Sequence, residues 1–172
     1  AYPNISSRER DRTLKLLRLN NFSNELSLSV FCLMPNHFHF LLKQKSANTI
    51  DNFMNSLSTR YVMYFNKKYK RVGPLYQGVY KAVLIESEAQ LLYLTAYIHR
   101  NPLGLQISQR DLLRIQQPTS YAEYLGLRKT NWVKPDEILS YFSRTNPQLS
   151  YQSFVGQQMD FTSIKDLILE ND

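Results

Sequence analysis

The sequence is poor in several residue types, and each scarcity narrows the class of protein. It contains one cysteine, Cys32, in 172 residues, so an internal disulfide is excluded and no cluster of cysteine ligands can form. Cys32 lies in an apolar run, which indicates a buried thiol in a protein of the reducing cytoplasm. No apolar run approaches the roughly 20 residues that a membrane-spanning helix needs, and no signal peptide is visible. We therefore expect no membrane association and one globular domain, with room for an appendage.

Acidic residues are absent from the middle of the chain. None lies between Asp51 and Glu86, whereas the whole chain carries a formal charge of +7 and a pI near 9.5. Such a charge favours polyanions, because phosphate binding releases condensed counterions. In the acid-free interval cations alternate with aromatic rings, as single-stranded nucleic acid requires. We predict nucleic-acid contacts at Arg60, Lys67, Lys68, Lys70, Arg71, Tyr76 and Lys81.

Plainer interpretations of the same stretch stay open. An ordinary basic protein has a similar overall charge, and the cations at 67–71 suit a solvated helix end, where they meet the helix dipole favourably. Helical spacing also assigns three of the rings to the core, namely Tyr61, Tyr64 and Phe65.

Hydrophobic periodicity predicts a mixture of helices and strands. Ser6 and Ser7 with Glu9 form a capping start for a helix to about residue 19. Apolar and polar residues alternate over 26–34 and resume over 37–43 after Pro35-Asn36, which indicates an antiparallel hairpin. We expect further helices over residues 47–68, 87–100, 120–127, 136–142 and 163–169, and a further strand over 79–85. The expected architecture is α+β, with helices covering one face of an antiparallel sheet.

The tripeptide His37-Phe38-His39 is the strongest local indication of a functional site. Residues two apart on a strand point to one face, so both imidazoles project together. Phe38, Phe40 and Leu42 are then expected to point the other way, into the core. Two neutral imidazoles can hold a divalent cation, although two histidines that simply face solvent are an alternative, since a metal site needs further ligands.

The helix expected over 87–100 carries the second candidate group. Tyr97 and Asn101 are four residues apart and share a face. A tyrosine hydroxyl beside a metal can attack a phosphodiester, and the Asn101 amide oxygen can be a third ligand. Tyr93, one turn earlier, is a rival nucleophile, while His99 is expected to face elsewhere. Aromatic residues at helical spacing are also common in cores, so this helix alone does not decide between the two interpretations.

Three motifs together resemble a known family. The segment Cys-Leu-Met-Pro-Asn-His-Phe-His-Phe-Leu-Leu (32–42) resembles the His-hydrophobic-His signature of the IS200-like, single-tyrosine transposases. Gly-Pro-Leu-Tyr-Gln-Gly (73–78) and Tyr-Ile-His-Arg-Asn-Pro (97–102) are similar to segments of the REP-associated branch, as is the tail Ser-Tyr-x-x-Tyr-Leu-Gly (120–126) with Trp132. The Asn-Pro-Leu-Gly-Leu at 101–105 departs from the usual Asn-Pro-Val-Arg-Ala-Gly.

The resemblance implies a fold, a reaction and a site. It implies a ferredoxin-like catalytic domain over 1–103, with its opening strand missing, and a helical C-terminal extension over 104–172. His37 and His39 are implied as metal ligands for Mg²⁺ or Mn²⁺, Tyr97 as nucleophile, and Asn101 as the position of a third ligand. The implied reaction cleaves and rejoins hairpin-bearing single-stranded DNA through a 5′-phosphotyrosine, in the bacterial cytoplasm near the nucleoid, by a monomer or homodimer.

Two other functions share this pattern. One is a catalytically inactive module that binds hairpin DNA or RNA, and the other is a replication or mobilisation nickase with the same chemistry. A decayed binding module is expected to lose the histidine pair or the tyrosine, and both are present here.

Overall fold

The computed structural model describes residues 6, 8, 21–103, 118–157 and 159–168. The helix expected up to residue 19 and the chain over 104–117 lie outside these residues. The described elements are two strands, several α-helices and short 3₁₀ helices, so the α+β class is confirmed. An antiparallel pair flanked by helices is consistent with the expected ferredoxin-like core.

The sheet is the predicted hairpin. Strand β1 (Leu26–Leu33) pairs antiparallel with β2 (Phe38–Gln44), with Cys32 opposite His39. The turn between them is closed by a 2.9 Å hydrogen bond from the Met34 N–H to the His37 carbonyl. The other edge of β1 is met by short bridges, antiparallel from Cys32 to Thr119 and parallel from Leu28 to Val133. Both edges of β1 are therefore occupied.

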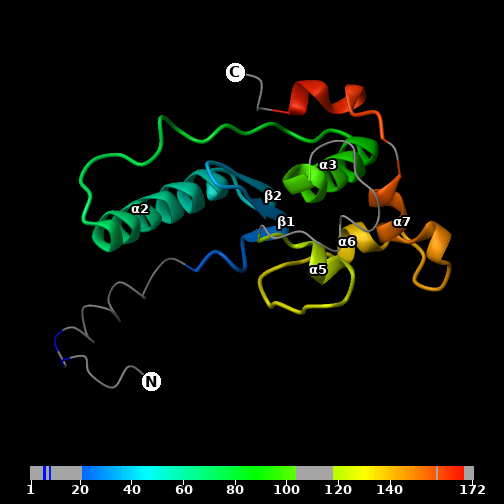
Figure 1. Ribbon diagram of the computed structural model, residues 1–172, viewed down its shortest axis with the longest axis horizontal. Helices are drawn as coiled ribbons and strands as arrows, with labels where there is room; N and C mark the ends of the chain where they lie inside the picture. The colour runs from blue at the N-terminus through cyan, green and yellow to red at the C-terminus, as the bar shows by residue number, and fades with distance from the viewer. Residues whose placement is uncertain (1–5, 7, 9–20, 104–117, 158, 169–172) are drawn as a thin grey trace.

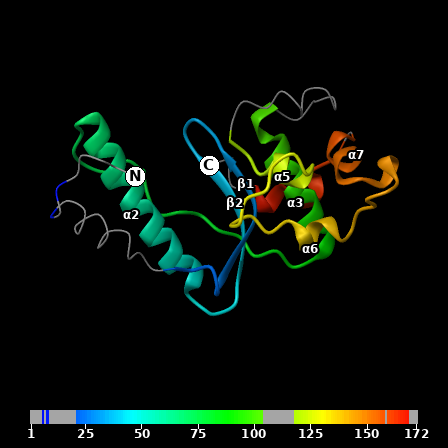
Figure 2. The same ribbon diagram turned by 90° about the horizontal axis from the view of Figure 1, so that it is seen from below.

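The hairpin lies between two long helices (Figures 1 and 2). Helix α2 (Thr49–Tyr69) confirms the helix predicted over 47–68 and ends at Lys70, whose left-handed backbone donates its N–H to the Asn66 carbonyl. A connector over residues 70–87 runs back along the molecule (Figure 1), and the Tyr80 hydroxyl is hydrogen-bonded to Asp51 in the first turn of α2. That bond attaches the connector to the start of the helix.

Helix α3 (Glu88–Arg100) begins and ends as the sequence predicts. Ser87 and Gln90 form the reciprocal capping box, which satisfies backbone N–H groups at the start of the helix. The 3₁₀ helix η1 (Asn101–Leu103) then ends it at the expected Asn-Pro pair. The buried residues Leu94, Tyr97 and Ile98 of α3 pack with Val30, Cys32 and Leu41 of the hairpin in one hydrophobic cluster.

The described residues of 118–168 pack against both α3 and β1. Their elements are α5 (Tyr121–Tyr124), α6 (Asp136–Leu139), η2 (Pro147–Leu149), α7 (Tyr151–Gly156) and η3 (Thr162–Leu167). The helices predicted over 120–127, 136–142 and 163–169 are confirmed as shorter elements, the last of them 3₁₀. The sequence pattern did not predict α7 or η2. The division of the chain at residue 103 stays a prediction.

A buried histidine joins these segments. His99 is fully buried, and its ring nitrogens are hydrogen-bonded to the Tyr151 hydroxyl at 2.7 Å and to Ser120 Oγ at 2.8 Å. Ser120 Oγ also accepts the Phe31 N–H of β1 at 2.9 Å. Burial lowers the pKa of His99 to about 3, so the imidazole is neutral near neutral pH. One side chain thus links α3, α7 and the hairpin.

The structure corrects two of the predictions about buried and paired segments. The stretch 79–85 is extended but belongs to no strand, because none of the described residues forms a ladder with it; β-branched residues favour an extended backbone, but a strand also needs a partner. The core lies on the histidine face of β2, where Leu41 is buried, whereas Phe38, Phe40 and Leu42 are only half-buried. The reason is that α3 and the segments around it cover the histidine face.

Candidate active site

The two histidines lie on one face, as the strand spacing predicts. His37 immediately precedes β2 and His39 is its second residue, and their ring centroids are 4.9 Å apart in an edge-to-face arrangement. The Nε2 atoms of both rings are shielded from solvent. The two imidazole nitrogens lie on adjacent, nearly perpendicular rings in a sheltered position, so they are suited to bind one divalent ion together.

Asn36 determines which nitrogen of His37 carries the proton. Its side-chain oxygen lies 2.8 Å from His37 Nδ1. An amide oxygen only accepts hydrogen bonds, so Nδ1 is the donor, and in a neutral ring Nε2 keeps its lone pair. Histidines that bind metals commonly donate their other N–H in this way, which fixes the ring and raises its basicity. The donor set at His37 therefore fits a metal ion.

Tyr97 approaches the histidines from α3. Its ring centroid lies 6.1 Å from that of His39, at an interplanar angle of 81°. The ring of Phe161 also contacts Tyr97, with a centroid distance of 5.6 Å. Tyr97 is only 7% exposed and belongs to the hydrophobic core cluster. Strand β2 with its histidines and helix α3 with Tyr97 are far apart in sequence. They are in contact here, as the resemblance implies.

Asn101 lies one helical turn beyond Tyr97. Its backbone is still helical, and its N–H donates to the Tyr97 carbonyl, so the two side chains start from the same face of the helix. Among the residues that the structure describes, no group of three or more His, Cys, Asp and Glu residues is arranged to hold a metal ion. The role of the Asn101 amide as a third ligand beside the two imidazoles stays a prediction.

The rival nucleophile Tyr93 has different surroundings. Its ring contacts Phe154 of α7 at 6.2 Å, on the side of the residues that follow position 118. His99 points into the interior, as its position on the helix predicts. The surroundings of Tyr97 therefore differ from those of Tyr93 and His99.

Phe161 and Arg100 are the residues of this region that the sequence analysis missed. Arg100 is 2% exposed, its Nη1 donates to the Gln157 carbonyl at 2.6 Å, and its guanidinium lies 5.5 Å from the Phe161 ring. Burial lowers the pKa of Arg100 from its usual value. Phe161 lies in a segment with weak periodicity, so no local signal connects it with Tyr97.

The predicted nucleic-acid contacts fall into one cluster and several outliers. Lys67, Lys68, Lys70 and Arg71 are all exposed at the end of α2. Lys68 Nζ lies 5.3 Å from the Tyr69 ring and 5.7 Å from that of Tyr64, and Arg71 lies over Phe65. Arg60 is half-buried more than a turn before this cluster, and Lys81 is exposed on the connector.

The aromatic residues of this region are distributed differently from the prediction. Tyr61 is 44% and Tyr64 is 58% exposed, so assigning them to the core was wrong; the described residues that pack on α2 leave this side of the helix open. Tyr76 is half-buried between Phe38 of β2 and Tyr61 of α2. The exposed rings available for stacking are therefore Tyr61, Tyr64 and Tyr69, whereas Tyr76 connects the helix with the sheet.

Comparison with known proteins identifies the class. The chain matches the model of the transposase family described as IS200-like over residues 3–101. This match covers more than half of the 172 residues, so the protein belongs to the IS200-like transposase family. The searches of curated proteins and of solved structures each returned no significant match.

The matched range includes both histidines, Tyr97 and Asn101, and it ends before the described residues of 118–168. Within the described residues, no helix has the length and apolar character to cross a membrane.

Replacing Asn36 tests the hydrogen bond that orients His37. In Asn36→Ala, Nδ1 of His37 loses its acceptor, so we expect the share of the Nε2-protonated tautomer of His37 to rise while that of His39 is unchanged. Long-range ¹⁵N–¹H correlation spectra of the imidazoles measure both. Asn36→Asp, which keeps an acceptor at the same place, is the matched control and should retain the Nδ1-protonated form. An identical tautomer in wild type and Asn36→Ala would refute this assignment.

Proposed function

We propose that the protein is a metal-dependent endonuclease and strand transferase that acts on hairpin-bearing single-stranded DNA through a 5′-phosphotyrosine. The observation that carries the proposal is the 6.1 Å contact between the rings of His39 and Tyr97. Membership of a transposase family supports the same chemistry. The alternative is a binding module of the same fold that holds a hairpin in DNA or RNA without cutting it.

The chemical step assigned to Tyr97 is a phosphoryl transfer. The Tyr97 hydroxyl attacks the scissile phosphorus, a Tyr–O–P bond forms and the P–O3′ bond breaks. The phenolic proton leaves Tyr97 and the departing 3′ oxygen gains a proton, so the products are a 5′-phosphotyrosine and a free 3′-hydroxyl. Attack of a 3′-hydroxyl on the phosphotyrosine reverses these changes and rejoins the strand. No external energy source is needed, because the linkage is conserved.

The residues that would hold the metal are His37 and His39 through Nε2, with the Asn101 amide oxygen as the third ligand. A bound Mg²⁺ or Mn²⁺ would polarise the phosphodiester and make phosphorus more electrophilic. Imidazole is a softer ligand than oxygen, so this donor set favours Mn²⁺ over Mg²⁺. The hydrogen bond from His37 Nδ1 to Asn36 keeps the lone pair of Nε2 available.

The DNA single strand is proposed to follow the exposed side of α2 towards its end. The cations there neutralise phosphates, and Tyr61, Tyr64 and Tyr69 offer ring faces to the bases. Lys68 lies over two of these rings, so a charge and a stacking surface occupy one place. Tyr76 joins this side of α2 to Phe38, the residue between the two histidines.

Removing the Tyr97 hydroxyl tests the nucleophile. Tyr97→Phe should abolish the covalent adduct with a hairpin oligonucleotide, detected by denaturing electrophoresis, while hairpin affinity changes less than about threefold because the ring still packs against His39 and Phe161. Tyr93→Phe is the matched control and should retain the adduct. An adduct that persists in Tyr97→Phe and disappears in Tyr93→Phe would reassign the nucleophile. Binding by the wild type with no cleavage in any metal would favour the inactive module.

Removing the metal tests the role of the histidine pair. EDTA should stop cleavage, and Mn²⁺ should restore it at a lower concentration than Mg²⁺. His39→Ala should lower the cleavage rate by at least about 100-fold, since one of the two imidazole ligands is lost. Fluorescence anisotropy of a labelled hairpin, measured in EDTA, separates loss of chemistry from loss of binding. Undiminished cutting in chelator would remove the metal from this proposal.

Neutralising the end of α2 tests the DNA path. Replacing Lys67, Lys68 and Lys70 with glutamine should weaken DNA binding and lower the slope of log K against log salt by up to about 2, at roughly 0.7 per phosphate contact for single strands. Anisotropy titrations at several salt concentrations measure the slope.

The matched control removes the same charge elsewhere, from the exposed cations Lys45, Arg144 and Lys165. An equal loss of slope in both triple variants would mean that overall charge, and not the end of α2, determines binding.

A further inference from the structure

The loop between α5 and α6 exposes the single tryptophan of the chain. Trp132 is 56% exposed, and its ring lies 5.2 Å from that of Phe31, a residue of β1 that is only 6% exposed. The indole thus packs on the sheet through Phe31, while more than half of the surface of Trp132 is exposed. This loop (residues 125–135, here called the Trp132 loop) lies beyond the range that matches the family.

A network of hydrogen bonds holds the loop in one conformation. Arg128 donates from Nε and Nη2 to the two carboxylate oxygens of the buried Glu123, both at 2.6 Å. The Thr130 hydroxyl donates to the same carboxylate at 3.1 Å, and Arg128 also reaches the Thr119 carbonyl. A ligand that binds a preformed loop loses less free energy to ordering, so the network favours a recognition role.

The loop is also fixed directly to β1. The Lys134 N–H donates to the Leu28 carbonyl at 2.9 Å, and Val133 forms a bridge with Leu28. The position of Trp132 is therefore coupled to the strand that pairs with the histidine strand.

The charge of the loop suits an anionic ligand. Lys129 and Lys134 are exposed and flank Trp132 in sequence, and the nearest acidic residues are Glu123 and Asp136 at the two ends of the loop. Glu123 already neutralises Arg128, so the two lysines supply the remaining positive charge. An aromatic face between two cations matches a nucleotide, whose base can stack while its phosphates meet the ammonium groups.

A small polar cavity adjoins the loop. It has a volume of about 200 Å³, and its lining includes Thr130, Asn131 and Lys134 together with the acidic residues Glu123 and Asp136. The volume exceeds the roughly 30 Å³ share of one water but is below the 300–1,000 Å³ of sites for drug-sized ligands. The cavity thus has room for one base, whose polar edge could meet this mixed lining, and not for a duplex.

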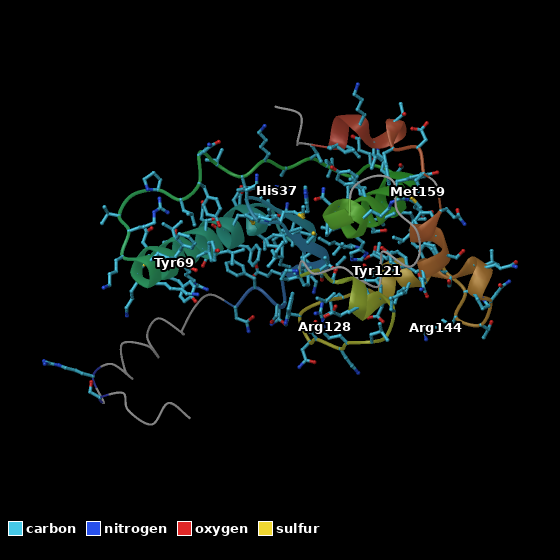
Figure 3. The ribbon with its side chains drawn as sticks, in the orientation of Figure 1. His37, Tyr69, Tyr121, Arg128, Arg144 and Met159 are labelled. Carbon is cyan, nitrogen blue, oxygen red and sulfur yellow. The ribbon has the colours of Figure 1, made fainter. Side chains whose placement is uncertain are left out.

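The loop lies close to the candidate active site but on another side of the hairpin. Phe31, which supports Trp132, is adjacent to Cys32, and Cys32 pairs with His39. Figure 3 shows His37 above the hairpin and Arg128 below it. A DNA hairpin with single-stranded flanks is a substrate that could reach both sides of the β-hairpin.

We propose that the Trp132 loop is a second nucleic-acid site that binds an unpaired nucleotide flanking the hairpin of the DNA substrate. This inference takes the identity of the DNA from the proposed function. It does not depend on cleavage of that DNA. The cations at the end of α2 (Lys67, Lys68, Lys70 and Arg71) would hold the strand that enters the active site. The Trp132 loop would hold a different part of the same DNA molecule.

Intrinsic fluorescence reports on this contact directly, because Trp132 is the only tryptophan. We expect a hairpin oligonucleotide with single-stranded flanks to quench its emission on binding to the Tyr97→Phe protein, which cannot be consumed by cleavage. A blunt hairpin of the same stem should quench much less. Emission unchanged while anisotropy shows saturated binding would overturn the proposal. Emission that changes with protein concentration in the absence of DNA would assign the loop to self-association and also overturn it.

Substitutions provide a second measurement. Trp132→Ala should weaken binding of the flanked hairpin about 5- to 100-fold, the range that loss of one stacked base gives, and should not change binding of the blunt hairpin. Trp132→Phe should recover part of the affinity. Leu127→Ala is the matched control, because Leu127 is 72% exposed in the same loop, and its effect should be less than twofold.

A variant that leaves the core untouched covers the case in which Trp132→Ala fails to fold. Lys129→Gln with Lys134→Gln should lower the salt slope of flanked-hairpin binding by roughly 1.4, for two single-strand phosphate contacts. An unchanged slope would contradict the proposal. Quenching without an adduct in the wild type would refute the proposed nuclease and keep this site. An adduct without quenching would support the proposed nuclease and refute this site.

Discussion

The contact between α3 and the hairpin determines the geometry of the candidate site, and it depends on a buried histidine. The Tyr151 hydroxyl can donate to His99 Nδ1, and the His99 Nε2–H can donate to Ser120 Oγ, which also accepts the Phe31 N–H. The Ser120 hydroxyl then donates to the Phe31 carbonyl. In this assignment both ring nitrogens of His99 and the Ser120 hydroxyl have partners, and an unpaired one would cost about 1–3 kcal/mol. Because these bonds join α3 to β1 and α7, they hold α3 against the hairpin and so position Tyr97 beside His39.

The residues beyond the family match complete this arrangement. Ser120 and Tyr151 supply both partners of His99, Gln157 accepts from Arg100, and Phe161 packs on Tyr97. Separating the chain at residue 103 would expose the imidazole and the guanidinium to water and remove one of the two rings that hold the tyrosine. The range that carries the family motifs therefore contains the proposed reactive groups, while the following residues contribute to their positions.

Local signals predicted those parts of the structure that depend on neighbours in sequence. The hairpin followed from alternation around Pro35-Asn36, and the start of α3 followed from Ser87 and Gln90. Predictions failed where the outcome depends on distant partners. The stretch 79–85 has strand propensity but no ladder partner among the described residues. Tyr61 has helical spacing, but its side chain is 44% exposed. Phe161 could not be connected with Tyr97, because a contact across 64 positions leaves no periodic trace.

The alternation of β2 separates the two parts of the proposed function. His37 and His39 face α3, and their Nε2 atoms are shielded from solvent, which strengthens electrostatic interactions there. Phe38 faces the other way and contacts Tyr76, which reaches Tyr61 on the exposed side of α2. The proposed chemistry and the proposed strand binding thus involve opposite faces of one strand, only one residue apart. A shift of one residue in the register of β2 would exchange these faces and bring the phenyl ring to Tyr97 in place of an imidazole. The hairpin register, fixed by Cys32 opposite His39, is therefore a requirement for both functions at once.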